Sequence, residues 1–432
     1  MKIKNINASV LSLSLALTIL LPIIIFFTLG QWVKNEPAYL LIHTIIEGFA
    51  VLISFMIFSV GWNSYHKPQR MNIVVLACAF LVGGAVDLGY ILSYQGMPDL
   101  ISYNSPHKAI IFWLAARLLV VATLLAVSLF KWKAPVVPII RYILLAVSVF
   151  FMGFIYFIGL FHAHSVPITF IDGLGPTGFK TTAEILIMLI LVLTIFVSHN
   201  RLLCESSCSY LTAGLLMMVV SELCFTLYFS ASVNFHLLGH IYKVVAYVFI
   251  YKAIFVDQVQ KPYNKLRHLA YYDSLTALPN RNLFLKRLIW VVKEAESNQS
   301  GLAVIFLDFD GFKGVNDSYG HLVGDQLLKQ FAERATLLFP DRKDTVARFG
   351  GDEFILFIES NHKQEVRIIA EKLLEASSRP YLIGDFVINI SSSIGISLYP
   401  DNSRDVETLI KLADEAMYVA KKRGKNNFQF VD

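Results

Sequence analysis

Charged residues are scarce in this chain: only 16% of its 432 residues are Asp, Glu, Lys or Arg, whereas 56% are hydrophobic and the mean hydropathy is +0.58. Such averages do not fit a single soluble domain, and the length suggests two or three domains. The averages also conceal a division. Up to about Phe255 the chain consists of long apolar runs, and beyond it charge is dense and helix-period and strand-period segments alternate.

Cysteine is also rare. Cys78, Cys204, Cys208 and Cys224 stand at irregular positions, which excludes a secreted disulfide framework. Cys204 and Cys208 would lie one helical turn apart, so a metal pair and two reduced thiols are both open interpretations. The junction near residue 256 has no Gly/Ser-rich stretch, which argues against a flexible tether between the two parts.

The apolar runs are each about long enough to cross the hydrocarbon core of a membrane. We expect about eight spans, at residues 10–30, 38–61, 72–95, 109–130, 138–161, 183–198, 209–230 and 236–256. Lys2 and Lys4 precede the first run as in a signal peptide, but no small-residue cleavage site follows, so we expect a retained helix. Residues 1–256 are therefore predicted to form an all-α polytopic membrane bundle.

Basic residues indicate how this bundle is oriented. One set of span ends carries Lys2, Lys4, Lys67, Arg70, Lys131, Lys133 and Arg201, and the opposite loops hold only Lys34, Lys108 and Lys180. The positive-inside rule then places the N-terminus in the cytoplasm of a bacterial inner membrane, and an even number of spans returns the C-terminal part there. The net charge of +5 is accounted for in this way, and we expect no nucleic-acid partner.

Ionisable residues gather near the outer ends of the spans. They are His43, His107, His162, His164, His236, His240, Glu47, Asp87, Glu184 and Glu222. His43 and Glu47 would share a helix face, as would His236 and His240. Because such groups are expensive in a bilayer, two interpretations stay open. The first is structural pairing between helices, with Asp87 or Glu222 neutralised by Arg117 or Lys243. The second is an outward-facing input site for a transition metal, a haem or a proton, and its candidate residues are His43, Glu47, Asp87, His107, Arg117, Glu222, His236 and His240.

Several local motifs accompany these residues: His43-x-x-x-Glu47, Trp62-Asn63, Asp87 followed by Tyr94-Gln95-Gly96-Met97-Pro98, and Trp113-x-x-x-Arg117. Through them, residues 35–256 resemble the membrane-associated sensor (MASE) domains, most nearly the third class. Tyr90 departs from the resemblance, since a histidine is expected there after the aspartate. The resemblance implies a sensor and names no signal.

Residues 257–272 form a polar, helix-compatible segment that continues the last span, with apolar positions too sparse for a coiled coil. We expect a signalling helix here. It ends in Asp273-Ser274-Leu275-Thr276-Ala277-Leu278-Pro279-Asn280-Arg281, where Pro279 and Asn280 favour a turn before a helix that opens near Asn282.

Residues 273–432 alternate in pattern. Helices are expected at 281–297, 322–338, 363–377 and 405–422, and strands at 302–308, 345–349, 354–358, near 386–398 and at 427–431. This order predicts a sheet with helices on one side, an α+β domain of ferredoxin-like type.

Three acidic residues are predicted to converge in this domain. Gly350-Gly351 splits two apolar runs as a hairpin turn would, and Asp352 and Glu353 follow at its tip. Asp308 ends the strand that precedes the hairpin. One or two carboxylates together with substrate phosphates are the usual holders of Mg²⁺, and the Phe309 carbonyl could add a ligand. The sequence therefore predicts a site for Mg²⁺ (or Mn²⁺), with two ions able to stabilise the attacking and leaving oxygens of an in-line displacement.

A nucleotide would complete this site. After Asp308 comes Gly311-Phe312-Lys313-Gly314-Val315-Asn316-Asp317, a loop whose backbone N–H groups and lysine suit phosphates. Asn316 and Asp325 suit the adjacent N–H donors of guanine. Lys421 and Lys425, one turn apart, could hold a triphosphate.

Residues 265–432 resemble the GGDEF-family diguanylate cyclases. The motifs are Asp-x-Leu-Thr-x-Leu-Pro-Asn-Arg, Asp-Phe-Asp-x-Phe-Lys-x-Val-Asn-Asp and Gly-Gly-Asp-Glu-Phe, in this order. The resemblance implies that two GTP molecules are joined 3′ to 5′ into cyclic di-GMP with loss of pyrophosphate, by a homodimer in which two domains face each other. It implies that Asp308, the Phe309 carbonyl, Asp352 and Glu353 hold the metals, and that Asp352 activates the 3′-hydroxyl. The remaining implied contacts are to guanine and phosphates, from Asn316, Asp325, Phe312, Lys313, Lys421 and Lys425.

The chain departs from this family at two places. Many relatives carry an Arg-x-x-Asp product-inhibition site before the hairpin; here Asp344 fills its second position and Asp341 its first, with Arg342 one residue off. An aspartate there repels phosphates, so we expect weak feedback inhibition. Lys425 replaces a common arginine and loses its bidentate fork. Two other readings are a catalytically silent receptor for GTP or cyclic di-GMP and, from the bundle alone, a transporter with a fused regulatory domain.

Overall fold

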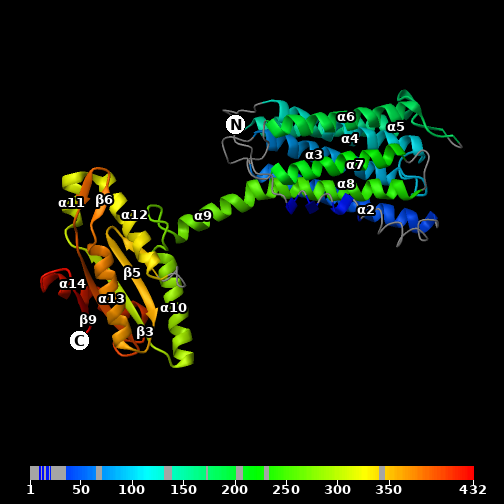
Figure 1. The fold of residues 1–432 in the computed structure, drawn as a ribbon. Helices are drawn as coiled ribbons and strands as arrows, with labels where there is room; N and C mark the ends of the chain where they lie inside the picture. The colour runs from blue at the N-terminus through cyan, green and yellow to red at the C-terminus, as the bar shows by residue number, and fades with distance from the viewer. Residues whose placement is uncertain are drawn as a thin grey trace. The chain divides into compact units, whose positions relative to one another are not determined.

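The computed structural model describes residues 9, 10, 12, 13, 16–18, 20, 36–64, 71–130, 139–171, 174–200, 208–227, 233–339 and 346–432. The chain forms two compact units, Met1–Tyr263 and Asn264–Asp432. The first is a membrane unit of helices and the second is built around a sheet (Figure 1).

Long apolar helices make up the membrane unit, as the sequence predicts. They are α2 (Glu36–Asn63), α3 (Met71–Leu92), α4 (Pro106–Leu129), α5 (Ile140–Phe161), α6 (Gly178–Asn200), α7 (Cys208–Leu227) and α8 (Val233–Phe255). Within the described residues, seven helices are long and apolar enough to cross a membrane. Most of the first expected span, 10–30, lies outside the described residues. The all-α bundle is confirmed.

The helices of the membrane unit lie side by side (Figure 1). α3 packs between α2 and α4, and α8 packs between α2 and α7. A short 3₁₀ turn (η3, Ala163–Ser165) and a two-stranded hairpin of β1 (Phe170–Ile171) and β2 (Gly175–Pro176) connect α5 to α6. The basic residues that fix the predicted orientation lie mostly outside the described residues, among them Lys67, Arg70, Lys131, Lys133 and Arg201.

The segment after α8 is helical throughout. A π-helical turn, η4 (Val256–Gln260), follows α8 directly and leads into α9 (Lys261–Tyr271). Lys261 Nζ lies 2.7 Å from Asp257 Oδ1 and spans this turn. Single π-helical turns inside helices are frequently found at functional sites, and the sequence pattern gave no sign of this one.

A five-stranded sheet forms the centre of the second unit. Its order is β4 (Val346–Gly350), β5 (Glu353–Glu359), β3 (Leu302–Phe309), β8 (Ser392–Tyr399) and β9 (Phe428–Phe430), antiparallel except for the β8–β9 pair. The helices are α10 (Arg281–Asn298), α11 (Phe312–Tyr319), α12 (His321–Leu337), α13 (Lys363–Ser378) and α14 (Val406–Lys422). A small hairpin of β6 (Tyr381–Ile383) and β7 (Phe386–Ile388) lies outside the sheet.

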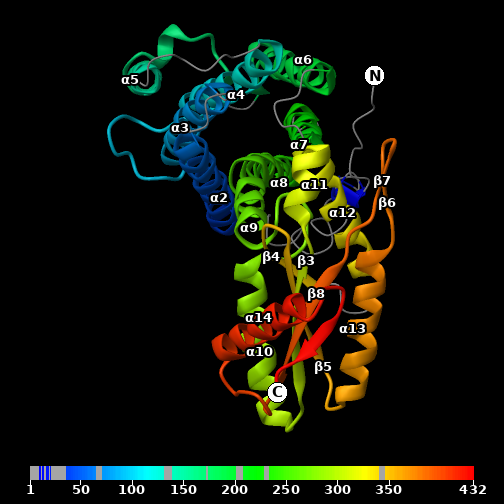
Figure 2. The ribbon, with the colours of Figure 1, turned by 90° about the vertical axis from the view of Figure 1, so that its left-hand side faces the viewer.

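The prediction that helices cover one side of this sheet was wrong. Every residue of β3 is buried. Its odd-numbered residues, such as Ile305, share a core with α12 and α13, and its even-numbered residues, such as Val304, share a second core with α10 and α14. Figure 2 shows α10 and α14 on one side of the strands and α12 and α13 on the other. The unbroken apolar run of β3 is typical of a strand that is buried on both faces.

Two further elements differ from the sequence predictions. The stretch from Phe312 to Asp317, expected as a loop, belongs to helix α11. Gly311 precedes it with φ 82°, a conformation that favours glycine and allows the sharp turn out of β3. The β6 strand was not predicted, since three residues are too few to show a period.

Candidate functional site

Asp308 and Glu353 face each other at one end of the sheet. Asp308 stands near the end of β3, and Glu353 opens β5 as its antiparallel partner. Directly opposed residues in such a pair have Cα atoms about 4.5–5.5 Å apart. Asp352 precedes Glu353 in the turn, where Gly351 adopts φ 52°. The register therefore brings the three predicted acids to one place.

Lys421 is the cation nearest to Asp308 in this site. It lies in the last turn of α14, and its Nζ is 2.5 Å from Asp308 Oδ1. Burial raises the pKa of Asp308, the hydrogen bond from Lys421 opposes this rise, and the charge of Asp352 adds to it. Burial also raises the pKa of Glu353, and the charges of Asp308 and Asp414 raise it further.

The donor set fits a hard divalent cation. Carboxylate oxygens are the ligands that Mg²⁺ prefers, and three carboxylates here stand against one ammonium group. Because Asp308 is an expected metal ligand, its contact with Lys421 places the lysine ammonium group where a metal ion is expected. Asp308, the Phe309 carbonyl, Asp352 and Glu353 are the groups that could hold the ion.

Asp310 is a residue of this region whose role the sequence did not reveal. Its carboxylate accepts hydrogen bonds from Ser391 Oγ (2.6 Å), Ser393 Oγ (2.7 Å) and the backbone N–H of Asn426 (3.1 Å). It thereby ties the end of β3 to β8 and to the turn that carries Lys425. Its position two residues after Asp308 was the only signal, and a linear sequence does not show which hydroxyl groups it meets.

Arg348 connects the hairpin to the turn before α10. Its guanidinium donates to the Gly351 carbonyl (2.9 and 2.7 Å) and to Asp273 Oδ1 (3.0 Å). Burial would raise the pKa of Asp273, but hydrogen bonds from Thr276 and Arg348 hold it below its ordinary value. Asn280 caps α10 by accepting from the Leu283 N–H at 3.1 Å, which confirms the predicted helix start.

The predicted guanine-reading residues lie on neighbouring helices. Asn316 is on α11 and Asp325 is the fifth residue of α12, and both are half-buried. Gly324 lies against Asn316: a Cβ built there would stand 2.0 Å from Asn316 Oδ1. Any side chain at position 324 would displace the Asn316 amide.

The predicted phosphate contacts differ in their exposure. Lys313 and Lys425 are exposed, and Lys425 lies in the turn after α14 with φ 64°. Phe312 is half-buried, with its ring centroid 6.3 Å from that of Phe309. Asp341, Arg342 and Asp344 of the product-inhibition motif lie outside the described residues.

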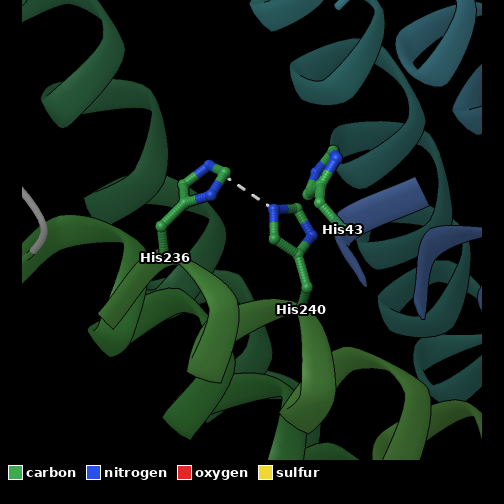
Figure 3. A group of neighbouring side chains, drawn as sticks. All are labelled: His43, His236 and His240. Atoms are coloured by element: carbon green, nitrogen blue, oxygen red, sulfur yellow. Dashed lines mark hydrogen bonds between the residues drawn. The ribbon is translucent and has the colours of Figure 1, made fainter. Parts of the chain in front are cut away.

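In the membrane unit, several candidate sensor residues form one buried cluster. Glu47 accepts hydrogen bonds from His240 Nδ1 and from Lys243 Nζ (2.8 Å), and Lys243 Nζ also lies 2.8 Å from Asp87 Oδ2. All four side chains are fully buried. His43 and His236 lie beside His240 (Figure 3). The predicted neutralisation of Asp87 by Lys243 is thus present, and it shares the lysine with Glu47.

The other candidate sensor residues make separate contacts. Arg117 Nε lies 3.4 Å from Glu222 Oε1, both fully buried. His107 contacts Thr169 Oγ1 (2.8 Å) and the Ala163 carbonyl (3.1 Å). Among the described residues, it is therefore not part of the His43–His236–His240 group. Tyr90, in the place where a histidine was expected, contacts His43 Nε2 at 2.9 Å.

Two family models match this chain. The membrane-associated sensor domain MASE3 matches residues 35–262, and the diguanylate cyclase GGDEF domain matches residues 270–427. The first covers more than half of the chain. The chain belongs to the MASE3 family of membrane sensor proteins, and its C-terminal domain is a GGDEF diguanylate cyclase domain.

Individual relatives resemble the C-terminal part. The chain is 42% identical over 180 residues to the bifunctional diguanylate cyclase/cyclic di-GMP phosphodiesterase MucR of Pseudomonas aeruginosa, a match that covers 42% of this chain and 26% of MucR. It is 36% identical over 169 residues to the diguanylate cyclase TpbB of the same species, covering 39% of each. The solved GGDEF domain of TpbB is 35% identical with a TM-score of 0.36, covering 38% of this chain and 95% of that domain. The matches thus span less than half of these curated relatives.

Proposed function

We propose that this protein is a membrane-bound diguanylate cyclase that condenses two GTP molecules into cyclic di-GMP and two pyrophosphates. The observation that carries the proposal is the opposition of Asp308 and Glu353 across the β3–β5 pair, with Asp352 beside them and Lys421 against Asp308. A group of acids this close is unfavourable unless cations neutralise it.

The reaction needs a nucleophile, a leaving group and a proton acceptor. The 3′-hydroxyl oxygen of one GTP bonds to the α-phosphorus of the other, the bond from that phosphorus to the bridging oxygen breaks, and pyrophosphate leaves. Asp352 accepts the hydroxyl proton, since it lies in the hairpin turn and is half-buried. The same step between the remaining 3′-hydroxyl and the remaining α-phosphorus closes the ring and releases the second pyrophosphate.

The other side chains bind and orient GTP. The Asp325 carboxylate accepts from the adjacent N–H donors of guanine, and the Asn316 amide binds the same base. Lys313, Lys421 and Lys425 neutralise the phosphates. Asp308, the Phe309 carbonyl, Asp352 and Glu353 would hold Mg²⁺ or Mn²⁺, two ions for each site. Bound there, such ions neutralise charge that develops on the phosphate oxygens.

The assembly follows from the product. Each domain holds one GTP, and the product has two-fold symmetry, so the active species is a homodimer whose two sites face each other. The bundle lies in the lipid bilayer of a bacterial inner membrane with the GGDEF domain in the cytoplasm, where GTP is available.

Product analysis tests this proposal. The purified full-length protein is incubated with GTP and Mg²⁺ and the products are identified by mass spectrometry. Cyclic di-GMP and pyrophosphate in a one-to-two ratio are expected. GTP that binds but stays unchanged would instead support the second candidate, a silent receptor for GTP or cyclic di-GMP.

A further inference from the structure

Three histidine side chains meet inside the membrane unit. His43 comes from α2, whereas His236 and His240 come from successive turns of α8 (Figure 3). One ring nitrogen of each histidine lies within 4.8 Å of the others. His43 and His240 are fully buried. Burying three polar rings inside a membrane unit costs free energy unless each ring has a binding partner there.

Two of the three rings are held through their Nδ1 atoms. The Tyr39 hydroxyl lies 2.5 Å from His236 Nδ1, and the Glu47 carboxylate accepts from His240 Nδ1. Hydrogen bonds of this kind orient metal-binding histidines and leave the other ring nitrogen for the ion. The Nε2 atoms of His236 and His240 accordingly turn toward each other.

The distance between these atoms matches a shared ion. Two imidazole nitrogens bound to one tetrahedral Zn²⁺, each at about 2.0–2.1 Å, are roughly 3.3 Å apart. His236 Nε2 and His240 Nε2 lie 3.4 Å apart. The third ring has a buried nitrogen to offer, because within the described part of the chain His43 Nδ1 has no hydrogen-bond partner.

The charges around the cluster favour a cation. Glu47 and Asp87 carry two negative charges, and both contact the single ammonium group of Lys243 at 2.8 Å. All three are fully buried. Arg117 and Glu222 nearby balance each other. One negative charge is therefore left in a region of low dielectric, where an added cation is strongly attracted.

We propose that His43, His236 and His240 bind one divalent transition-metal ion of the class that prefers imidazole, such as Zn²⁺, Cu²⁺ or Ni²⁺. Glu47 acts as a positioning residue through His240, and the Tyr90 hydroxyl holds the other nitrogen of the His43 ring, Nε2, at 2.9 Å. The same hydroxyl lies 3.4 Å from His240 Nε2. Tyr90 and His236 also line a cavity of about 170 Å³. Pockets for drug-sized ligands measure about 300–1,000 Å³, so the cavity suits a bare ion better than a haem.

The site links two helices, one of which leads out of the bundle. Binding of the ion joins α2 to α8, and α8 continues through η4 into α9. At about 1.5 Å per residue, roughly 28 Å of helix separates His236 from Phe255. Ion occupancy can thus act on the segment that precedes the GGDEF domain. Binding of the ion to the three histidines does not depend on whether the GGDEF domain is catalytically active.

Metal binding to the full-length protein in lipid nanodiscs tests the proposal. Chelator-treated protein is dialysed against Zn²⁺ alone, and against Co²⁺ alone for its visible spectrum, and bound metal is measured by elemental mass spectrometry. With excess Mg²⁺ added to fill the carboxylate site of the GGDEF domain, we expect about one Zn²⁺ or Co²⁺ ion per chain and a tetrahedral Co²⁺ spectrum. His43→Gln and His236→Gln should each weaken binding at least tenfold, and Glu47→Gln about 10–100-fold. His107→Gln is the matched control and should bind like the parent, because His107 contacts Thr169 instead.

Folding is checked on the same samples by size-exclusion chromatography and thermal unfolding. Should Glu47→Gln fail to fold, the two histidine variants still decide the outcome. A folded parent that retains no ion would mean that the histidines take up only protons, and this overturns the proposal. Equal retention by His43→Gln, His236→Gln and the parent would place the ion elsewhere in the chain and overturns it as well.

Discussion

Lys421 Nζ lies 2.5 Å from Asp308 Oδ1, which pairs the last turn of α14 with the end of β3. The sequence assigned these two residues to different partners, phosphate for the lysine and metal for the aspartate. Both assignments belong to the GTP-bound site that we propose. In the protein alone the two charges neutralise each other. When GTP and the metal ion bind, the contact between Lys421 and Asp308 is replaced by contacts of Lys421 with phosphate and of Asp308 with the ion.

Replacing Lys421 by Met should lower kcat/KM for GTP by about 10²-fold, the size of effect expected when one charge-stabilising donor is removed. Lys421 opposes the rise in the pKa of Asp308. Its loss raises that pKa further, so the acidic limb of the kcat/KM profile should move to higher pH. Lys422→Met is the control, since the Lys422 ammonium lies over the Tyr418 ring at 4.3 Å. An unchanged profile in Lys421→Met would contradict the pairing.

Glu353→Gln should stabilise the protein at neutral pH in the presence of a chelator. The pKa of Glu353 is raised in the folded chain, so the folded state binds a proton more readily than the unfolded state. The ionised carboxylate therefore destabilises the fold above that pKa, and the penalty disappears as pH falls toward the ordinary value of about 4.3. We expect a gain of at most about 1 kcal/mol, because the side chain is partly exposed and solvent screens the repulsion.

Thermal unfolding of this variant and the parent across pH measures the gain. Added Mg²⁺ should raise the Tm of the parent more than that of Glu353→Gln, because only the parent keeps the full set of ligands. Glu359→Gln, at the exposed end of β5, is the matched control and should unfold like the parent. A Tm for Glu353→Gln below that of the parent at neutral pH would refute the prediction.

Asp310→Asn should raise KM for GTP more than it lowers kcat. The carboxylate holds Ser391, Ser393 and the N–H of Asn426, and through Asn426 the turn of Lys425. An amide cannot accept from all three, and a hydrogen bond lost at a charged group costs about 1.5–3 kcal/mol. Steady-state kinetics and thermal unfolding measure the two effects. Ser393→Ala removes one of the three donors and should show a smaller change in both; the reverse order would contradict this role.

Gly395→Ala should destabilise the GGDEF domain severely. β8 and α14 approach so closely at this point that a Cβ would lie 1.9 Å from the Ala413 carbonyl and 2.2 Å from the Met417 N–H. Overpacking of this kind costs about 1–3 kcal/mol or more, and it would shift the helix that carries Lys421. Gly314→Ala is the control, since no atom lies within 4 Å of a Cβ there. Equal Tm values for the two variants would disprove the close approach.

Much of the fold could be predicted from local pattern. The period of the apolar residues gave α10, α12, α13 and α14 to within a residue or two, and the Asn280 cap marked where α10 begins. The two covered faces of the sheet were missed because an apolar run such as Leu302–Leu307 does not show which elements pack on each face. α11 was missed because Gly311 and Gly314 lower the helical signal over eight residues.

The candidate site was predictable only in part. Motif order brought Asp308, Asp352 and Glu353 together, and the register of β3 with β5 agrees. The contacts of Asp310 and the contact of Arg348 with Asp273 join residues 75 or more positions apart, and a local sequence pattern does not show such contacts. In the bundle, helix periodicity paired His43 with Glu47 and His236 with His240, whereas only packing shows that both pairs meet.

Production of cyclic di-GMP by Asp352→Ala, compared with the parent, tests the central claim most directly. Both proteins are assayed with GTP and Mg²⁺ as folded, full-length dimers, and binding of a non-hydrolysable GTP analogue is measured alongside. The account predicts that the variant still binds the analogue and that its cyclic di-GMP falls at least about 10³-fold. A variant that makes as much cyclic di-GMP as the parent would contradict the assignment of these acids to catalysis.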